Sequence, residues 1–224
     1  MELRAKSEGG RHPRAGGDPG HLATGVRIGA WVPACAGMMA LTVTLLASEV
    51  ALAHTGAEHA FSFAAGFKHP LTGLDHMLAM VAVGLWAGLV GGRALWVWPV
   101  AFVGVMILGG LLGFAGIAVP MVEAGILASV VILGLLVLAA ARVPVTAGAA
   151  LVAAFALLHG HAHGAELPSE AAAASYAAGF AIATAILHAI GLGVAHIASN
   201  ASGRLAVRVA GGLVAAVGVA LAMQ

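Results

Sequence analysis

Long apolar segments separated by short polar breaks run from about residue 71 to the end of the chain. Each segment is near the length of about 20 residues that a helix needs to cross a bilayer. The breaks contain Gly, Pro or Arg, as in Gly91-Gly92-Arg93. No segment alternates with a period of two over about ten residues, which argues against a β-barrel. The pattern predicts an all-α polytopic membrane helix bundle with six transmembrane helices, at 71–91, 95–117, 121–141, 144–163, 171–197 and 204–223.

Composition supports a membrane location. The chain is 61% hydrophobic and only 8% charged, whereas a soluble domain carries about 25% charged residues. Its 32 glycines suit helices that pack closely in lipid, because small residues let the backbones approach. The net charge is +1 and the basic residues are scattered, so nucleic acid is not an expected partner.

The N-terminal part of the chain differs from the rest. Residues 1–37 are rich in Gly and Pro without a helical or strand period, and we interpret them as an over-extended gene start or a disordered extension. Residues 38–53 are apolar and end in Ala51-Leu52-Ala53, which is typical of a cleavable signal peptide. Cleavage would leave His54 at the N-terminus, where an α-amine and an imidazole together could bind a metal. Residues 54–69 would then be a short periplasmic segment, and 70–224 the six-helix domain.

Charge sets the expected orientation. With residue 54 outside, Lys68 is external, whereas four arginines fall on the cytoplasmic side: Arg93, Arg142, Arg204 and Arg208. An excess of basic residues in cytoplasmic loops is the usual arrangement. We therefore expect a multi-pass protein of the bacterial inner membrane, with the mature N-terminus in the periplasm.

Three ionisable residues open the first span: His69, Asp75 and His76. Such groups at membrane depth are costly and indicate a functional site. Pro70 suits the first position of a helix. In a regular helix Asp75 and His76 would lie about 8–10 Å deeper than His69. Two alternatives follow: His69 passes an ion to an inner site, or Gly73 breaks the helix and brings the groups together.

A second group of polar residues ends the fourth span. His159 and His163 are four residues apart, on neighbouring turns of one helix face, where two imidazoles can bind one metal. Glu166 continues this stripe, while His161 is rotated about 200° away and ranks below the others. His188, near the middle of the fifth span, is either a ligand or a hydrogen-bonded core residue.

The available ligands limit the metal. The chain has one cysteine and 11 histidines, so a site of nitrogen and oxygen ligands is expected, which suits Ni, Co, Zn or Cu(II). We expect the ion to be the cargo and predict no other cofactor. The phosphate-binding motif G-x4-G-K-[ST] is absent, so ATP hydrolysis is not expected.

These two groups of residues resemble the motifs of the HupE/UreJ family of nickel permeases. The family's H-x5-D-H motif fits His69, Asp75 and His76. Its F-H-G-x-[AV]-H-G-x-E motif fits, with Leu158 in place of Phe, at His159, Gly160, Ala162, His163, Gly164 and Glu166. The resemblance covers residues 54–224 and implies uptake of Ni²⁺ or Co²⁺. It also implies a functional link to hydrogenase or urease maturation proteins.

Two other classes of function remain as alternatives. One is a metal-binding accessory or sensor subunit that transports no ion. The other is an intramembrane serine protease with Ser202 as nucleophile, which is disfavoured because no histidine follows that serine. We therefore predict that the protein is not an enzyme.

Overall fold

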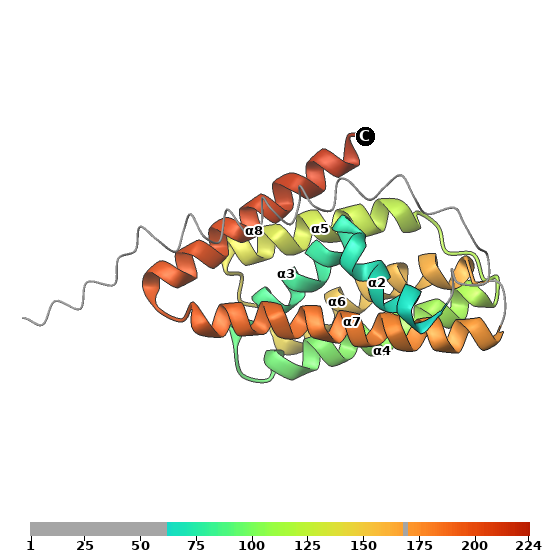
Figure 1. Ribbon diagram of the computed structural model, residues 1–224. Helices are drawn as coiled ribbons and strands as arrows, with labels where there is room; N and C mark the ends of the chain where they lie inside the picture. The colour runs from blue at the N-terminus through green and yellow to red at the C-terminus, as the bar shows by residue number, and fades with distance from the viewer. Residues whose placement is uncertain (1–61, 168–169) are drawn as a thin grey trace, which may run out of the picture.

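The computed structural model describes residues 62–167 and 170–224, and every regular element in these ranges is a helix. The helices are α2 (Phe63–Thr72), α3 (Leu74–Val90), α4 (Ala94–Phe114), α5 (Val122–Ala139), α6 (Val145–Ala165), α7 (Glu170–Ile197) and α8 (Ala201–Ala222) (Figure 1). The predicted all-α fold is confirmed. Residues 1–37, the predicted signal peptide at 38–53, and His54 lie outside the described residues.

The helices agree with the predicted spans. Five of them, α4 to α8, are long and apolar enough to cross a membrane. The pair α2 and α3 passes the same test when taken together, although it bends by 80° at the break between the two helices. The bundle therefore has five continuous candidate spans and a sixth that is broken.

The first helix begins earlier than the sequence predicts. We expected a helix to start at Pro70, but α2 already starts at Phe63, and Pro70 lies inside it. The reason is an N-cap, because the Ser62 side chain accepts a hydrogen bond of 3.1 Å from the backbone N–H of Ala65. The chain then breaks at Gly73, which is extended (φ −76°, ψ 109°).

The bundle is built from helix pairs held together at glycines. The closest pairs are α4 with α6, α5 with α8, and α3 with α7, while α2 packs on α7. Between α4 and α6, a Cβ at Gly160 would overlap the carbonyl oxygen of Met106, and one at Gly164 would overlap that of Gly110. Such close backbone contact is how membrane helices associate without a hydrophobic driving force.

The short helix α2 is fixed by the same means. Helices α2 and α7 carry the same four residues, Ala-Ala-Gly-Phe, and they meet at the glycines of these motifs, Gly66 and Gly179. A Cβ at Gly66 would overlap the carbonyl oxygen of Tyr176, and one at Gly179 would overlap that of Phe63. The position of α2 over the bundle therefore depends on α7.

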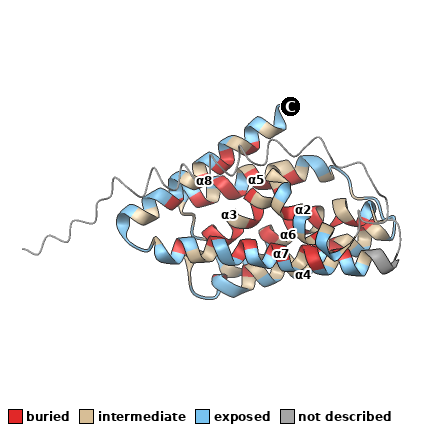
Figure 2. Ribbon diagram, viewed as in Figure 1, coloured by how far each residue is buried: buried red, intermediate tan, exposed pale blue. Residues whose placement is uncertain are grey.

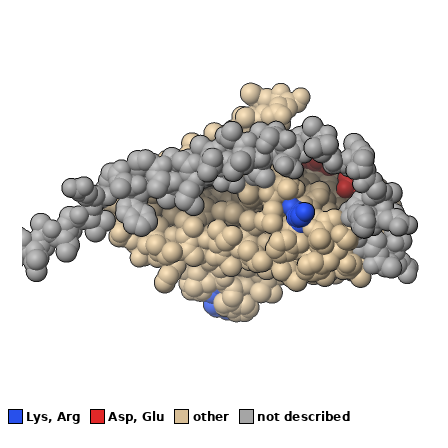
Figure 3. All heavy atoms as spheres, in the orientation of Figure 1, with Lys and Arg blue, Asp and Glu red and all other residues tan. Residues whose placement is uncertain are grey.

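The outer surface of the bundle suits lipid. Buried residues line the faces that helices turn toward one another, and exposed residues lie on the outer faces (Figure 2). Large apolar side chains are exposed there, such as Leu111 at 59% and Val100 at 63%. The face in Figure 3 shows few charged atoms. Such an apolar outer surface is expected of a protein that is embedded in a lipid bilayer.

The two ends of the bundle differ in charge. One end of the bundle holds Arg93 and Arg142 in its turns, and Arg204 and Arg208 in the first half of α8. There the Arg208 Nε donates to the carbonyl of Leu138, near the end of α5, at 2.8 Å. A cation at a helix C-terminus is favourable. Helix α6 starts at this end, after Arg142, and ends at the opposite end.

Candidate metal centre

The break at Gly73 brings two histidines together. His69 is in the last turn of α2, and His76 is in the first turn of α3. Because the chain turns by 80° between them, their ring centroids lie only 5.7 Å apart. Of the two alternatives that the sequence leaves open, the structure has the one in which the helix breaks.

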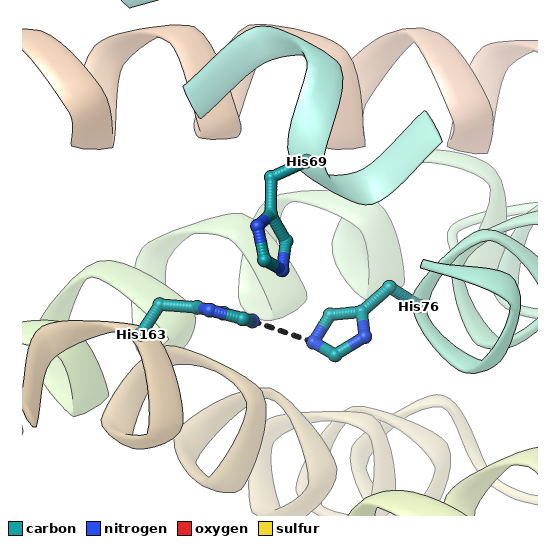
Figure 4. A group of neighbouring side chains, drawn as sticks. All are labelled: His69, His76 and His163. Carbon is teal, nitrogen blue, oxygen red and sulfur yellow. Dashed lines mark hydrogen bonds between the residues drawn. The ribbon is translucent and has the colours of Figure 1, made fainter. Parts of the chain in front are cut away.

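A third histidine comes from α6. His163 lies in the last turn of that helix, and its Nε2 is 2.6 Å from Nε2 of His76. Its ring centroid is 4.3 Å from that of His69. One ring nitrogen of each of these residues lies within 4.8 Å of the others, and the rings point toward a common point (Figure 4). We call His69, His76 and His163 the outer histidine group.

The carboxylate of Asp75 orients one member of this group. Its Oδ1 accepts hydrogen bonds from the backbone N–H of His76 at 2.8 Å and from the Nδ1 of the same residue at 2.7 Å. A carboxylate only accepts, so Nδ1 carries the proton and Nε2 presents a lone pair toward His163. A carboxylate behind an imidazole in this way fixes ring orientation and raises ligand basicity at metal sites. Asp75, predicted as a metal residue, thus contacts the group from behind.

His159 lies one turn before His163 on α6, as its spacing predicts, but outside the group within ligand distance. Its spacing from His163 suggested that the two share an ion, but the group within ligand distance contains His163 and not His159. The His159 Nδ1 donates to the Phe155 carbonyl at 2.9 Å. Its Nε2 has no partner among the described residues, and its ring centroid is 4.9 Å from that of His76. His159 therefore lies next to the outer histidine group, on the side of the bundle interior, without being a member of it.

Two aromatic residues of α7, which the sequence analysis missed, flank the outer histidine group. The Phe180 ring centroid is 4.8 Å from that of His163, and the Tyr176 centroid is 6.2 Å from that of His69. A cavity of about 390 Å³, lined mostly by apolar side chains of α4, α6 and α7, adjoins His163 here. The signal in the sequence was the second Ala-Ala-Gly-Phe motif, which ends in Phe180.

Three other predicted residues lie outside the outer histidine group. Glu166 is the exposed C-cap residue of α6, directly after the helix. The Nε2 of His161 donates to the backbone carbonyl of Ile117, between α4 and α5, at 2.7 Å. This bond gives His161 a structural role between α6 and the loop that follows α4. His188 is buried farther along α7.

Replacing His161 with alanine should therefore weaken the fold and leave metal affinity alone. The change removes a hydrogen bond worth about 1 kcal/mol and leaves the Ile117 carbonyl unpaired. We expect a lower midpoint of thermal unfolding in detergent and an unchanged KM for metal uptake. An unchanged midpoint with a KM raised about tenfold would instead assign His161 to the metal site.

Comparison with known proteins agrees with the resemblance in the motifs. The model of the HupE / UreJ protein family matches residues 39–221. The chain is also 50% identical over 184 residues to Protein HupE of Rhizobium leguminosarum bv. viciae. The aligned region covers 81% of this chain and 96% of that protein. No solved structure matches the chain.

Proposed function

Because the chain belongs to the HupE/UreJ family, we propose that it is a secondary permease for a divalent transition-metal cation, with Ni²⁺ as first substrate and Co²⁺ as second. One observation carries this proposal: three imidazoles from α2, α3 and α6 converge at one end of a multi-pass bundle. Imidazole nitrogen suits late first-row metals, whereas Mg²⁺, Ca²⁺ and Mn²⁺ prefer oxygen ligands. The outer histidine group would therefore bind late first-row metal ions in preference to Mg²⁺, Ca²⁺ and Mn²⁺.

The geometry supports a sequence of steps at the entrance. Glu166 is exposed after α6, and Glu123 is exposed in the first turn of α5, at the same end of the bundle. Carboxylates there raise the local cation concentration. An ion then exchanges water for ring nitrogens of the outer histidine group. Nitrogens at about 2.1 Å from one ion are at most about 4.2 Å apart, so a small side-chain rotation completes the site.

Asp75 supplies the charge that this step needs. Moving a dication out of water is unfavourable unless nearby charge compensates it. The side chain of Asp75 is 28% exposed, and it reaches the ion's position only through His76. It would offset the lost hydration without binding the ion tightly, which favours release to the interior.

The charge asymmetry supports an orientation. The arginine-bearing end of the bundle would face the cytoplasm, because basic residues concentrate on that side. The outer histidine group would then face the periplasm, and the protein would take up its ion across the bacterial inner membrane. A functional link to hydrogenase or urease maturation follows as part of this proposal, since such enzymes need a supply of nickel.

The chemistry of the described residues favours transport over catalysis. Ser129 donates its hydroxyl to the Ile126 carbonyl at 2.6 Å, and Ser202 is exposed in the first turn of α8, at the arginine-bearing end of the bundle. A serine protease needs a base within hydrogen-bond reach of its nucleophile. A metal-binding accessory or sensor subunit remains the second candidate, because the outer histidine group would serve that role as well.

Transport by the purified protein tests the proposal. We expect liposomes that contain the protein and an internal metal-sensitive dye to take up Ni²⁺ down its gradient without ATP. Uptake of Co²⁺ should be slower, and uptake of Mg²⁺ should equal that of empty liposomes. Metal binding in detergent without influx above empty liposomes would reject the permease and favour the accessory or sensor subunit.

A further inference from the structure

A buried histidine in the middle of α7 has no hydrogen-bond partner in the part of the chain that the structure describes. His188 is 1% exposed, and both of its ring nitrogens lack a partner among the described residues. A neutral imidazole carries one donor and one acceptor. Leaving such groups unpaired in an apolar interior is unfavourable by about 1–3 kcal/mol each. The placement of His188 therefore calls for a ligand that the described residues do not supply.

Two thioethers lie beside Thr184, the residue one helical turn before this histidine on α7. Thr184 precedes His188 by four residues on α7, which places both side chains on one face of the helix. The Thr184 hydroxyl donates to Sδ of Met80 at 3.3 Å and lies 3.7 Å from Sδ of Met106. Because both sulfurs are near one oxygen atom, α3, α4 and α7 each direct a donor group to the same place.

The packing of α3 on α7 fixes this place. A Cβ at Gly84 would overlap the carbonyl oxygen of His188, so the two backbones touch at that level. Met80 lies one turn before Gly84 on α3, fully buried at 0% exposure. The donors are thus held by backbone contacts and not by flexible loops.

The position continues inward from the outer histidine group. The ring of His76 contacts that of His159 at 4.9 Å between centroids, and His159 contacts Phe102 at 5.8 Å. Phe102 in turn contacts His188 at 5.0 Å. Each step leads farther from the entrance, so His188 lies beyond the group that first receives an ion.

We propose that His188, Met80 and Met106 form a second ion-binding position inside the bundle, with one imidazole and two thioethers as ligands. The proposal rests on the permease function proposed above and adds a second binding site along the path of the transported ion. Thr184 acts as a positioning residue, because a thioether that accepts its hydrogen bond keeps another lone pair for the ion.

The donor set defines the ion class. Thioethers are soft and uncharged and do not suit Mg²⁺ or Mn²⁺, which prefer oxygen ligands, whereas imidazole suits Ni²⁺ and copper. A hard ion that the entrance carboxylates attract would therefore be rejected at this inner position. Weak neutral ligands also let the ion leave, which conduction requires.

Metal loading of the full-length protein in detergent tests the proposal. The test variant is the double change Met80→Leu and Met106→Leu, because a Met-to-Leu exchange nearly conserves volume and keeps the fold. Wild type loaded with excess Ni²⁺ should bind two ions per chain and show sulfur scattering at the nickel absorption edge. The double variant should bind one ion fewer and lose the sulfur signal, and its Ni²⁺ influx in liposomes should fall about tenfold.

Two further variants complete the design. Met121→Leu makes the same chemical change at an exposed residue outside the bundle interior and should behave as wild type. His188→Leu should lose the inner ion while retaining the one at the outer histidine group. A wild type that binds one ion only, or whose nickel has only nitrogen and oxygen neighbours, would overturn the inner position. Those readouts do not depend on influx, so failure of the permease function is distinguished by liposomes that take up no Ni²⁺ at all.

Discussion

Replacing His76 with alanine is expected to reduce Ni²⁺ uptake by more than about a hundredfold. Among the described residues His76 contacts four members of the site: its Nε2 faces His163, its Nδ1 is held by Asp75, and its ring packs on those of His69 and His159. Without it, two nitrogens remain near the entrance, and neither has a carboxylate behind it. The measurement is the initial rate of influx into liposomes.

Changes at Asp75 separate charge from orientation. Asn in its place keeps a carbonyl oxygen that can accept the proton of His76 Nδ1, but it removes the negative charge. Ala removes both. We expect about tenfold slower uptake for Asp75→Asn and a larger loss, approaching that of His76→Ala, for Asp75→Ala. Equal losses in both variants would assign the effect of Asp75 to its charge alone.

The matched control for both positions is His196→Ala. His196 is an exposed histidine in the last turn of α7, at the arginine-bearing end of the bundle. Its loss removes an imidazole from the chain without touching the outer histidine group, so uptake should remain at the wild-type rate. Unchanged uptake in His76→Ala and in both Asp75 variants would contradict the assignment of the site.

The second large effect is expected from a single added methyl group. In Gly160→Ala, the new Cβ would overlap the Met106 carbonyl oxygen and lie 2.9 Å from the Gly110 nitrogen. These are backbone atoms on α4, so no side-chain rotation relieves the overlap, and α4 and α6 must separate. Overpacking commonly destabilises by about 1–3 kcal/mol, and more where the neighbour cannot move. We expect a sharp fall in the folded fraction extracted from membranes.

Gly104→Ala is the control for this change. Gly104 is also on α4, but a Cβ there meets nothing within 4 Å. Glycine in a helix is less favourable than alanine by about 1 kcal/mol, so this variant should be as stable as wild type or slightly more stable. The two variants are compared by size-exclusion profile and by thermal unfolding. Similar behaviour would mean that the close contact of α4 and α6 does not hold the bundle together.

Much of the fold could be predicted from the sequence, because membrane spans are read from apolar length alone. The two groups of ionisable residues were also visible, since few charged residues interrupt the spans. The rank of His161 below its neighbours followed from helical geometry, and its bond to the Ile117 carbonyl agrees with that rank.

The arrangement of the site could not be predicted, because it depends on one backbone break and on contacts between helices. Periodicity assumes a straight helix, and on that assumption His69 and His76 are too far apart to bind one ion. The extended backbone at Gly73 removes that separation. Likewise, the spacing of His159 and His163 shows that they share a face, but only the position of α3 decides which of them brings a ring nitrogen within hydrogen-bond distance of His76.

The docking of α2 gives metal binding a mechanical consequence. This helix has ten residues, which is too short to be stable by itself in water, and it is attached to α3 through a single extended glycine. An ion held by His69 on one side and by His76 and His163 on the other would be a reversible cross-link across that joint. By linkage, occupancy would strengthen the contact of α2 with α7 by as much as that contact strengthens binding. Binding of an ion by the outer histidine group and docking of α2 on α7 would thus strengthen each other by the same amount.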